Sequence, residues 1–214
     1  SPAYKVIQAG AKVLGNNKDG IDFSLEDDYY GDTRFHIPFI AWYQVMNASL
    51  ALTTMEVLKD RIPVTMEQLQ AGIANTRWQG RMETILPGVI VDGAHNEDGV
   101  RRFVETAERF QKEYPLTLLF SAVNDKDYQD MIHTICSRIK FRKVVTTEVG
   151  GYREVPSAEL AEIFCKEGCK DIGNSDNIEE AFHMAHEAKG EDGMLFCVGS
   201  LYLVGEIKTL LLKK

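Results

Sequence analysis

Hydrophobic and polar residues alternate in a regular way along the second part of the chain, from about residue 82 onward. Short apolar runs predict buried strands, and apolar residues at the 3.6-residue spacing of an amphipathic helix separate them. The predicted strands cover residues 89–92, 116–122, 143–147, 171–173 and 194–198. The predicted helices cover residues 100–110, 128–139, 157–164, 178–185 and 204–211. Strands that alternate with helices predict a parallel sheet with helices on both faces.

A hairpin is predicted at the start of this alternation. Residues 82–86 and 89–92 form two short apolar segments, and the turn-forming pair Pro87-Gly88 lies between them. The expected fold class is therefore α/β, with a Rossmann-like, mostly parallel sheet that begins with a hairpin.

The first 78 residues follow a different pattern. It predicts a helix over residues 4–14 that ends at Gly15-Asn16-Asn17, strands over 21–24 and 35–39, and helices over 42–55 and 66–74. Thr65 is the candidate N-cap of the last helix. The pattern changes near residues 77–80, so we divide the chain into residues 1–78 and 79–214.

Composition restricts the class of partner. The net charge of −8 argues against general nucleic-acid binding, which requires a basic face. A single nucleotide is still compatible with that charge, because a few cations and backbone amides suffice to hold one polyphosphate. No apolar run is long enough to span a bilayer, so we expect no transmembrane helix and no membrane partner.

The four cysteines favour a reducing compartment, and we expect a cytoplasmic protein. Cys136 and Cys165 fall on apolar helix faces and Cys197 falls within a strand, so small buried thiols are predicted. Cys165 and Cys169 are four residues apart, but no second Cys/His pair completes a zinc signature.

Candidate chemistry gathers between Gly80 and Gly99. The apolar run 89–91 ends at Asp92, and the chain then turns through His95 toward a helix with Asn96 as its expected N-cap. Ligands of open α/β sheets bind where strands end and helices begin, which makes Asp92 and His95 candidate site residues. Each has a structural alternative, because Asp92 could simply form the turn and His95 could be an ordinary loop residue.

Arg81 begins a predicted strand beside the boundary between the two parts of the chain. Its guanidinium could bind a phosphate, or it could form a surface ion pair with Glu83 or Asp92. The helix after Asp92 carries Glu97 and Asp98 in its first turn. These carboxylates already complement the positive helix end, so we assign no phosphate to it.

Three further segments carry polar residues that could serve a ligand or only the fold. Asn47 lies inside a predicted helix, where asparagine is unfavourable unless its amide is used or exposed. Ser200 follows the last strand and could simply cap the last helix. Lys126 and Asp127 begin a helix after the strand at 116–122, and a cap with a surface charge would account for them.

His183 and His186 are three residues apart on one helix, with Glu179, Glu180 and Glu187 nearby. This spacing could hold a metal ion, but a solvated helix face is the favoured interpretation, and no metal ligand is assigned. The chain also lacks a GxxxxGK[ST] phosphate-binding loop and a GxGxxG dinucleotide motif. A dehydrogenase is therefore disfavoured.

Five motifs, in this order, resemble the folylpolyglutamate synthase and dihydrofolate synthase family of the Mur ligase superfamily. They are Tyr43-Gln44-Val45-Met46-Asn47-Ala48, Trp78-Gln79-Gly80-Arg81, Asp92-Gly93-Ala94-His95-Asn96, Asp125-Lys126-Asp127 and Gly199-Ser200-Leu201-Tyr202-Leu203. The DGAHN form favours the folate branch over the cell-wall ligases. Glu97 departs from the family, which often has proline there, and this should alter the start of the helix more than the chemistry.

The resemblance implies roles for five of the matched residues, and it places Lys126 and Asp127 at the ligand edge of the sheet without an assigned role. Arg81 would contact the ATP phosphates, Asp92 the nucleotide ribose, and Asn47 the adenine. His95 would face the incoming glutamate as the candidate catalytic residue, and Ser200 would help to bind that glutamate. Residues 1–78 would be the tail of an α/β ATPase domain and residues 79–214 the glutamate ligase domain, with a hinge near residues 77–80.

The implied reaction is the ATP-dependent addition of L-glutamate to folate or dihydropteroate through an acyl phosphate. ATP and Mg²⁺ would be required, and the P-loop, the metal ligands and a modified lysine would lie upstream of Ser1. This fragment alone would therefore be inactive, and the full-length protein is expected to be a monomer. The alternative is a non-catalytic α/β module that binds a ligand or a partner.

Overall fold

The computed structural model describes residues 10–17, 19–150 and 154–213. The chain forms two compact units, and the boundary between them in the sequence lies between Trp78 and Gln79. No helix in the described part of the chain is long and apolar enough to cross a membrane.

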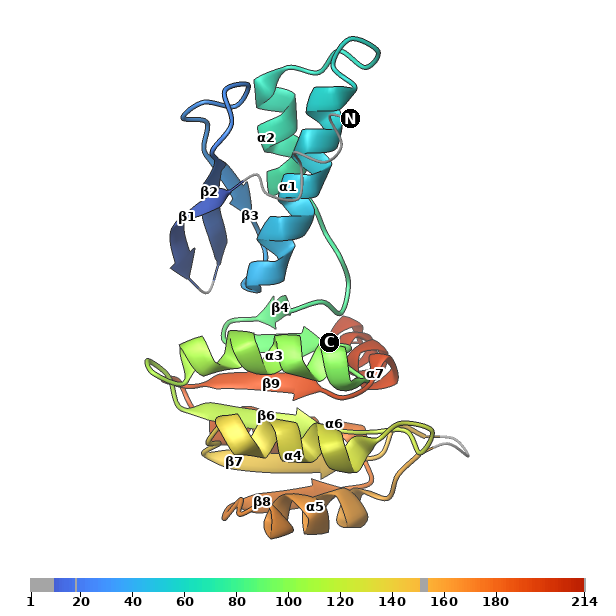
Figure 1. Cartoon of the computed structure of the whole chain (residues 1–214). Helices are drawn as coiled ribbons and strands as arrows, with labels where there is room; N and C mark the ends of the chain where they lie inside the picture. Colours follow the sequence, from blue (N-terminus) through green and yellow to red (C-terminus); the bar gives the residue numbers. More distant parts are fainter. Residues whose placement is uncertain (1–9, 18, 151–153, 214) are drawn as a thin grey trace. The chain divides into compact units, whose positions relative to one another are not determined.

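The N-terminal unit is a small antiparallel sheet covered by two helices (Figure 1). Its strands lie in the order β1 (Ala11–Asn17), β2 (Gly20–Leu25) and β3 (Phe35–Ile37). Helices α1 (Trp42–Val57) and α2 (Met66–Ala74) pack on this sheet. Thr65 is the N-cap of α2 as predicted, because its side chain accepts a hydrogen bond from the backbone N–H of Gln68.

The predicted helix over residues 4–14 is wrong where the structure describes it. Residues 11–14 belong to β1, which pairs with β2, and residues 4–9 lie outside the described residues. Ala11 and Val13, two residues apart, both pack on the core of this unit, which is the period of a strand rather than a helix. Gly15 does not end a helix but lies at a shift in the pairing register of β1 with β2.

The C-terminal unit confirms the predicted α/β class. Its six-stranded sheet has the order β4-β5-β9-β6-β7-β8, and every neighbouring pair is parallel except the hairpin β4–β5. The strands are β4 (Glu83–Leu86), β5 (Val89–Asp92), β6 (Leu116–Phe120), β7 (Lys143–Thr147), β8 (Ile172–Ser175) and β9 (Met194–Val198). Strands β5, β6 and β9 are buried at every position, as expected for a sheet covered on both faces.

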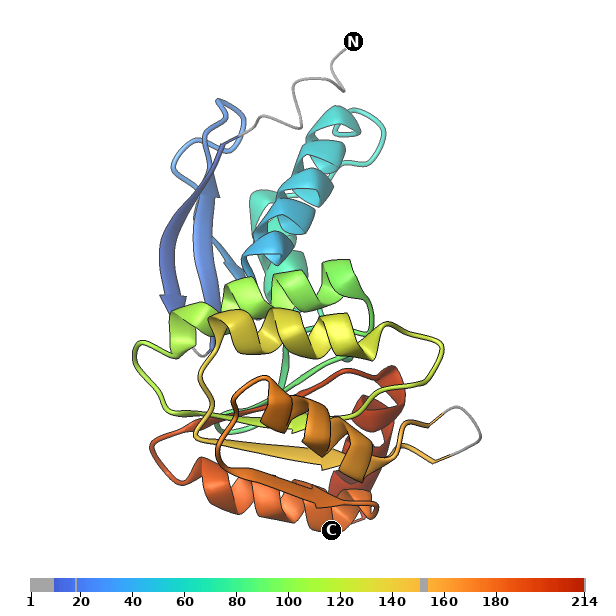
Figure 2. The same ribbon diagram turned by 60° about the horizontal axis from the view of Figure 1, so that its bottom comes forward.

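Helices cover both faces of this sheet. One face carries α3 (Glu97–Phe110), α4 (Tyr128–Arg138) and α5 (Ser157–Lys166), and the other carries α6 (Ile178–Lys189) and α7 (Leu201–Leu212) (Figure 1). Figure 2 shows α3 and α4 side by side along their face. Helices α3, α4 and α7 follow the parallel strands β5, β6 and β9, respectively. All three helices therefore begin at the carboxyl edge of the sheet.

Side chains cap these three helices where the sequence predicts them. Asn96 accepts a hydrogen bond from the Gly99 N–H, Asp127 from the Asp130 N–H, and Ser200 from the Tyr202 N–H. The caps fix where α3, α4 and α7 begin, and so they fix the loops at the carboxyl edge.

Candidate functional site

Three of the sequence motifs meet at the carboxyl edge of the six-stranded sheet. Asp92 at the end of β5 pairs with Val198 at the end of β9. Glu83 at the start of β4 pairs with Val91, because β4 runs antiparallel to β5. The segment before β4 and the loops after β5 and β9 are therefore neighbours in space.

Hydrogen bonds tie the first two of these segments together. The Gly93 N–H donates to the Gly80 carbonyl oxygen over 2.8 Å, and the Met82 N–H donates to Asp92 Oδ2 over 2.9 Å. Asp92 Oδ1 accepts from the Ala94 N–H over 2.8 Å, and only 4% of the Asp92 residue is exposed. The turn-forming role considered for Asp92 is thus present in the structure, and the same side chain also holds Met82.

The backbone around Arg81 is unusual. Gly80 has a φ of 66° and Met82 a φ of 45°, and Met82 is the one non-glycine residue with positive φ in the described part of the chain. A methionine in this region is strained, so surrounding contacts must hold it there. The hydrogen bond to Asp92 and the burial of the Met82 side chain provide those contacts.

The start of α7 packs on the same two segments. A Cβ at Gly93 would overlap the end of the Leu201 side chain, and a Cβ at Gly80 would lie 3.2 Å from Val204. Glycine at both positions therefore lets the third motif approach the first two. Sequence reasoning did not single out Gly80, Gly93 or Met82 as site-forming residues, although the glycines stand within the quoted motifs.

Arg81 is half-buried, and the structure does not show the ion pair considered for it. Among the described residues, Glu83 pairs with Lys208, whose Nζ lies 2.7 Å from Oε1, and Glu83 also accepts from the Gly80 N–H. Asp92 uses its oxygens for backbone N–H groups. The Arg81 guanidinium lies close enough to lower the pKa of Asp92, yet no ion pair joins it to Asp92 or Glu83 within the described part of the chain.

His95 and Ser200 are both anchored to the backbone of their loops. His95 Nδ1 lies 2.6 Å from the Gly93 carbonyl oxygen. A carbonyl only accepts, so Nδ1 carries the proton and, in the neutral ring, Nε2 keeps a free lone pair. Ser200 is buried, and its Oγ accepts from the Tyr202 N–H, which leaves its hydroxyl proton available to an acceptor.

Asn47 belongs to the N-terminal unit. It lies on the exposed side of α1, and its Nδ2 donates to Gln44 Oε1 over 2.9 Å. The Asn47 side chain is therefore exposed, as one of the two interpretations predicted, and its contact with adenine stays a prediction.

The cysteine prediction is correct in part. Cys197 is fully buried in β9, whereas Cys165 is exposed at the end of α5 and Cys136 and Cys169 are half-buried. The prediction that Cys165 is buried is wrong, because the apolar residues of α5 that reach the core are Leu160 and Phe164. Sequence reasoning also missed that Cys136 and Cys169 are in contact, since 33 residues separate them.

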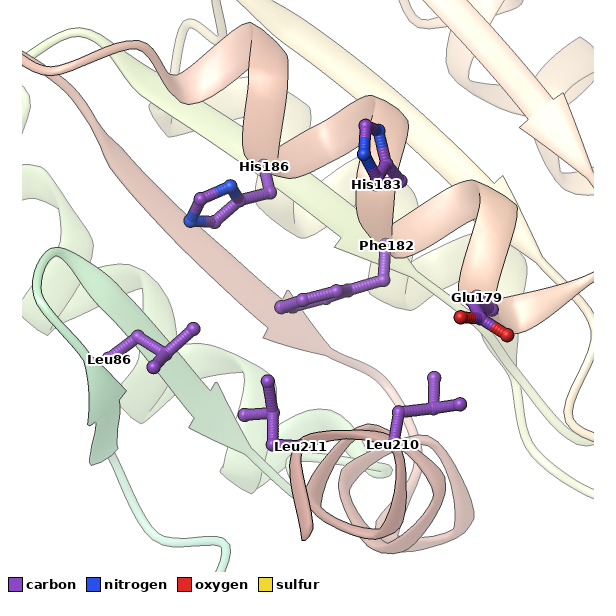
Figure 3. Close-up of a pocket in the computed structure, with 7 residues that line it drawn as sticks. All are labelled: Leu86, Glu179, Phe182, His183, His186, Leu210 and Leu211. Carbon is purple, nitrogen blue, oxygen red and sulfur yellow. The ribbon is translucent and has the colours of Figure 1, made fainter. Parts of the chain in front are cut away.

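His183 and His186 lie on an exposed face of α6, in agreement with the predicted solvated helix face. The His183 side chain is 70% exposed and pairs with Glu187. No group of three or more His, Cys, Asp or Glu side chains in the described part of the chain could hold a metal ion. Both histidines instead border a cavity of about 190 Å³ between α6 and α7, whose apolar walls include Phe182 and Leu211 (Figure 3).

Burial raises the pKa of Asp92 to about 6, and the N–H groups of Met82 and Ala94 and the charge of Arg81 only partly oppose this rise. An unfolded aspartate titrates near 3.9. The folded protein therefore binds the Asp92 proton more tightly, and stability from this group is complete below pH ~4 and is lost as the pH rises through about 6.

We expect the wild type to lose up to about 3 kcal/mol of stability relative to Asp92→Asn between pH 4 and 7, since two pKa units correspond to that energy. Urea unfolding of both proteins across this pH range measures the difference. Asp98→Asn is the matched control, because Arg102 and Arg101 lower the pKa of the exposed Asp98 and reverse the sign. A wild-type advantage over Asp92→Asn that stays constant or grows with pH would contradict the assignment.

A family model described as the Mur ligase, glutamate ligase domain matches residues 80–201, which is more than half of the chain. The chain belongs to the Mur ligase family. It is 30% identical over 194 residues to the dihydrofolate synthase/folylpolyglutamate synthase of Bacillus subtilis, covering 87% of this chain and 43% of that protein. The resemblance to the folylpolyglutamate and dihydrofolate synthases is thereby confirmed for this Mur ligase chain.

Solved structures show the same fold. The folylpolyglutamate synthase of Thermotoga maritima matches with a TM-score of 0.75 at 24% identity, over 94% of this chain and 46% of that one. The Mycobacterium tuberculosis folylpolyglutamate synthase complexed with ADP and AMPPCP matches with a TM-score of 0.74 at 22% identity, over 94% and 46%. This Mur ligase chain therefore spans less than half the length of each of these three relatives.

The region matched by the Mur ligase model contains Arg81, Asp92, His95 and Ser200. All four belong to the loops at the carboxyl edge of the sheet, which is where α/β folds bind their ligands. Asn47 lies outside the matched region.

Proposed function

We propose that the full-length protein is an ATP-dependent amide ligase that adds L-glutamate to folate or dihydropteroate. The observation that carries this proposal is the junction of the Gly80–Met82 turn, the Asp92–His95 loop and the start of α7 at one sheet edge. Residues 1–78 would be the end of the ATPase domain and residues 79–214 the glutamate ligase domain, and the whole protein would act as a monomer.

The proposed reaction has two steps. A carboxylate oxygen of the folate substrate takes the γ-phosphoryl group of ATP, which leaves an acyl phosphate and ADP. The amine of L-glutamate then attacks the acyl carbon, the bond from that carbon to the phosphate oxygen breaks, and phosphate leaves as the amide forms. Phosphorylation is needed because a free carboxylate is a poor acyl donor, and water must be excluded or it will hydrolyse the intermediate.

Arg81 and Asp92 would serve the nucleotide. An arginine with no carboxylate partner among the described residues can offer its full fork of donors to a phosphate and offset charge that develops during transfer. Each Asp92 oxygen accepts one backbone N–H, so a second lone pair on each is left for ribose hydroxyls.

His95 and Ser200 would serve the incoming glutamate. Because His95 Nδ1 donates to the Gly93 carbonyl, Nε2 is the nitrogen that can accept a proton from the glutamate amine. The buried Ser200 hydroxyl would donate to a glutamate carboxylate while its oxygen continues to cap α7. Both residues would then act on the second step.

No group of three or more His, Cys, Asp or Glu side chains among the described residues could hold the magnesium ion by itself. We propose that the ligands of the magnesium ion belong to a part of the full-length protein outside this chain. The present fragment would be inactive by itself, because it contains no P-loop motif.

The test is a ligase assay on the full-length protein with ATP, magnesium, L-glutamate and either dihydropteroate or a reduced folate. We expect phosphate release that requires both glutamate and the pterin substrate, and a product heavier by one glutamyl residue. Absence of product and of ATP binding by calorimetry would contradict the proposal and favour a non-catalytic binding module.

A further inference from the structure

Two thiols from distant parts of the sequence are in contact in the C-terminal unit. Cys136 lies on α4 and Cys169 lies three residues beyond the end of α5, and their sulfur atoms are 3.6 Å apart. The two helices are neighbours on one face of the sheet (Figure 1). No group of three potential metal ligands occurs in the part of the chain that the structure describes, so the pair is not part of a thiolate zinc site there.

A second interaction joins the same two segments. His133, one helical turn before Cys136, places Nδ1 2.9 Å from Oε2 of Glu167, two residues before Cys169. This hydrogen bond and the thiol contact therefore hold α4 against the end of α5 at two neighbouring points. This arrangement keeps the thiols together, which favours reaction between them over reaction with separate molecules.

The two thiols are not equivalent. The hydrogen bond from Cys136 lowers the pKa of Cys169, and the same bond together with burial raises the pKa of Cys136. Nearby Glu167 opposes ionisation of both. Cys169, which is half-buried and follows the exposed Gly168, is thus the thiol suited to attack first.

We propose that Cys136 and Cys169 form a reversible disulfide when a low-molecular-weight disulfide such as oxidised glutathione is the oxidant. The Cys169 thiolate attacks one glutathione sulfur, and the first glutathione thiolate leaves. Cys136 then loses its proton and attacks the Cys169 sulfur, which expels the second glutathione thiolate. The two cysteines lose two electrons in total, and one oxidised glutathione becomes two reduced molecules.

This dithiol is distant from the candidate functional site. Helices α4 and α5 begin at the carboxyl edge of the sheet and end near its amino edge, where Cys136 and Cys169 lie. Oxidation would cross-link α4 to the end of α5 and leave the loops of Arg81, Asp92 and His95 unchanged. The proposal therefore does not depend on the ligase reaction.

Trypsin separates the relevant cysteines, which makes the test direct. Cys136 falls in peptide 127–138, Cys165 in 154–166 and Cys169 in 167–170. The protein is incubated with oxidised and reduced glutathione at several ratios, quenched with acid, alkylated, and analysed by mass spectrometry. We expect a cross-link between peptides 127–138 and 167–170 that reduced glutathione reverses.

Three variants sharpen the result. Cys136→Ser should accumulate one glutathione on Cys169, because the resolving thiol is absent. Cys169→Ser should leave Cys136 reduced, and Cys165→Ser, the matched control, should form the disulfide as the wild type does. Free thiols at both Cys136 and Cys169 under conditions that modify Cys165, or a cross-link that involves Cys165, would overturn the proposal.

Discussion

Replacement of Arg81 by alanine is expected to reduce the ligase activity of the full-length protein by about 10²–10³-fold, the usual cost of removing one group that stabilises developing charge. Arg81 has no carboxylate partner among the described residues. Glu83 forms an ion pair with Lys208, and Asp92 accepts hydrogen bonds from backbone N–H groups. Its charge is therefore available to a phosphate. The loss should appear in kcat/KM for ATP, measured as phosphate release under saturating glutamate.

The matched control for this change is Arg101→Ala. Arg101 carries the same charge in the same unit, but it is exposed on α3 and pairs with Asp98. Its removal should leave kcat/KM within about twofold, because surface pairs contribute little. Urea unfolding should show both variants folded at the assay temperature. Full activity of a folded Arg81→Ala protein would remove Arg81 from the proposed nucleotide site.

Gly199→Ala is expected to destabilise the C-terminal unit by more than about 3 kcal/mol, the combined cost of backbone strain and overpacking. Gly199 has a φ of 110°, in the region that favours glycine, and an added Cβ would overlap the carbonyl oxygen of Ser121. The same Cβ would lie 2.8 Å from the ring of Phe120. Neither neighbour can move easily, because both Phe120 and Ser121 are fully buried.

Gly205→Ala is the matched control for Gly199→Ala. Gly205 lies inside α7, and apart from its chain neighbours and the backbone of its own helix, no described atom lies within 4 Å of an added Cβ. Alanine there should raise stability by about 0.5–1 kcal/mol, because it costs less chain entropy in a helix than glycine. Thermal and urea unfolding of the two variants and the wild type measure both effects. A Gly199→Ala protein within about 1 kcal/mol of the wild type would refute the packing argument.

The alternation of strands and helices could be predicted from local sequence because each C-terminal element carries its own period. The strand predicted at residues 143–147 coincides with β7, and the strand predicted at 194–198 coincides with β9. Caps were equally local, since Asn96, Asp127 and Ser200 bond to N–H groups two or three residues away. The failure at residues 11–14 shows the limit, because the partner that makes this segment a strand is β2.

The sequence by itself determined the fold class, the order of the elements in the C-terminal unit and the loops that carry Arg81, Asp92, His95 and Ser200, because periodicity, turn residues and caps act over a few positions. Tertiary structure alone decided what those side chains contact. The burial of Asp92 and the pairing of Glu83 with Lys208, 125 residues away, depend on segments that meet only in the folded sheet. The contact of Cys136 with Cys169 has the same origin, since packing of α4 on α5 brings together thiols that no local pattern connects.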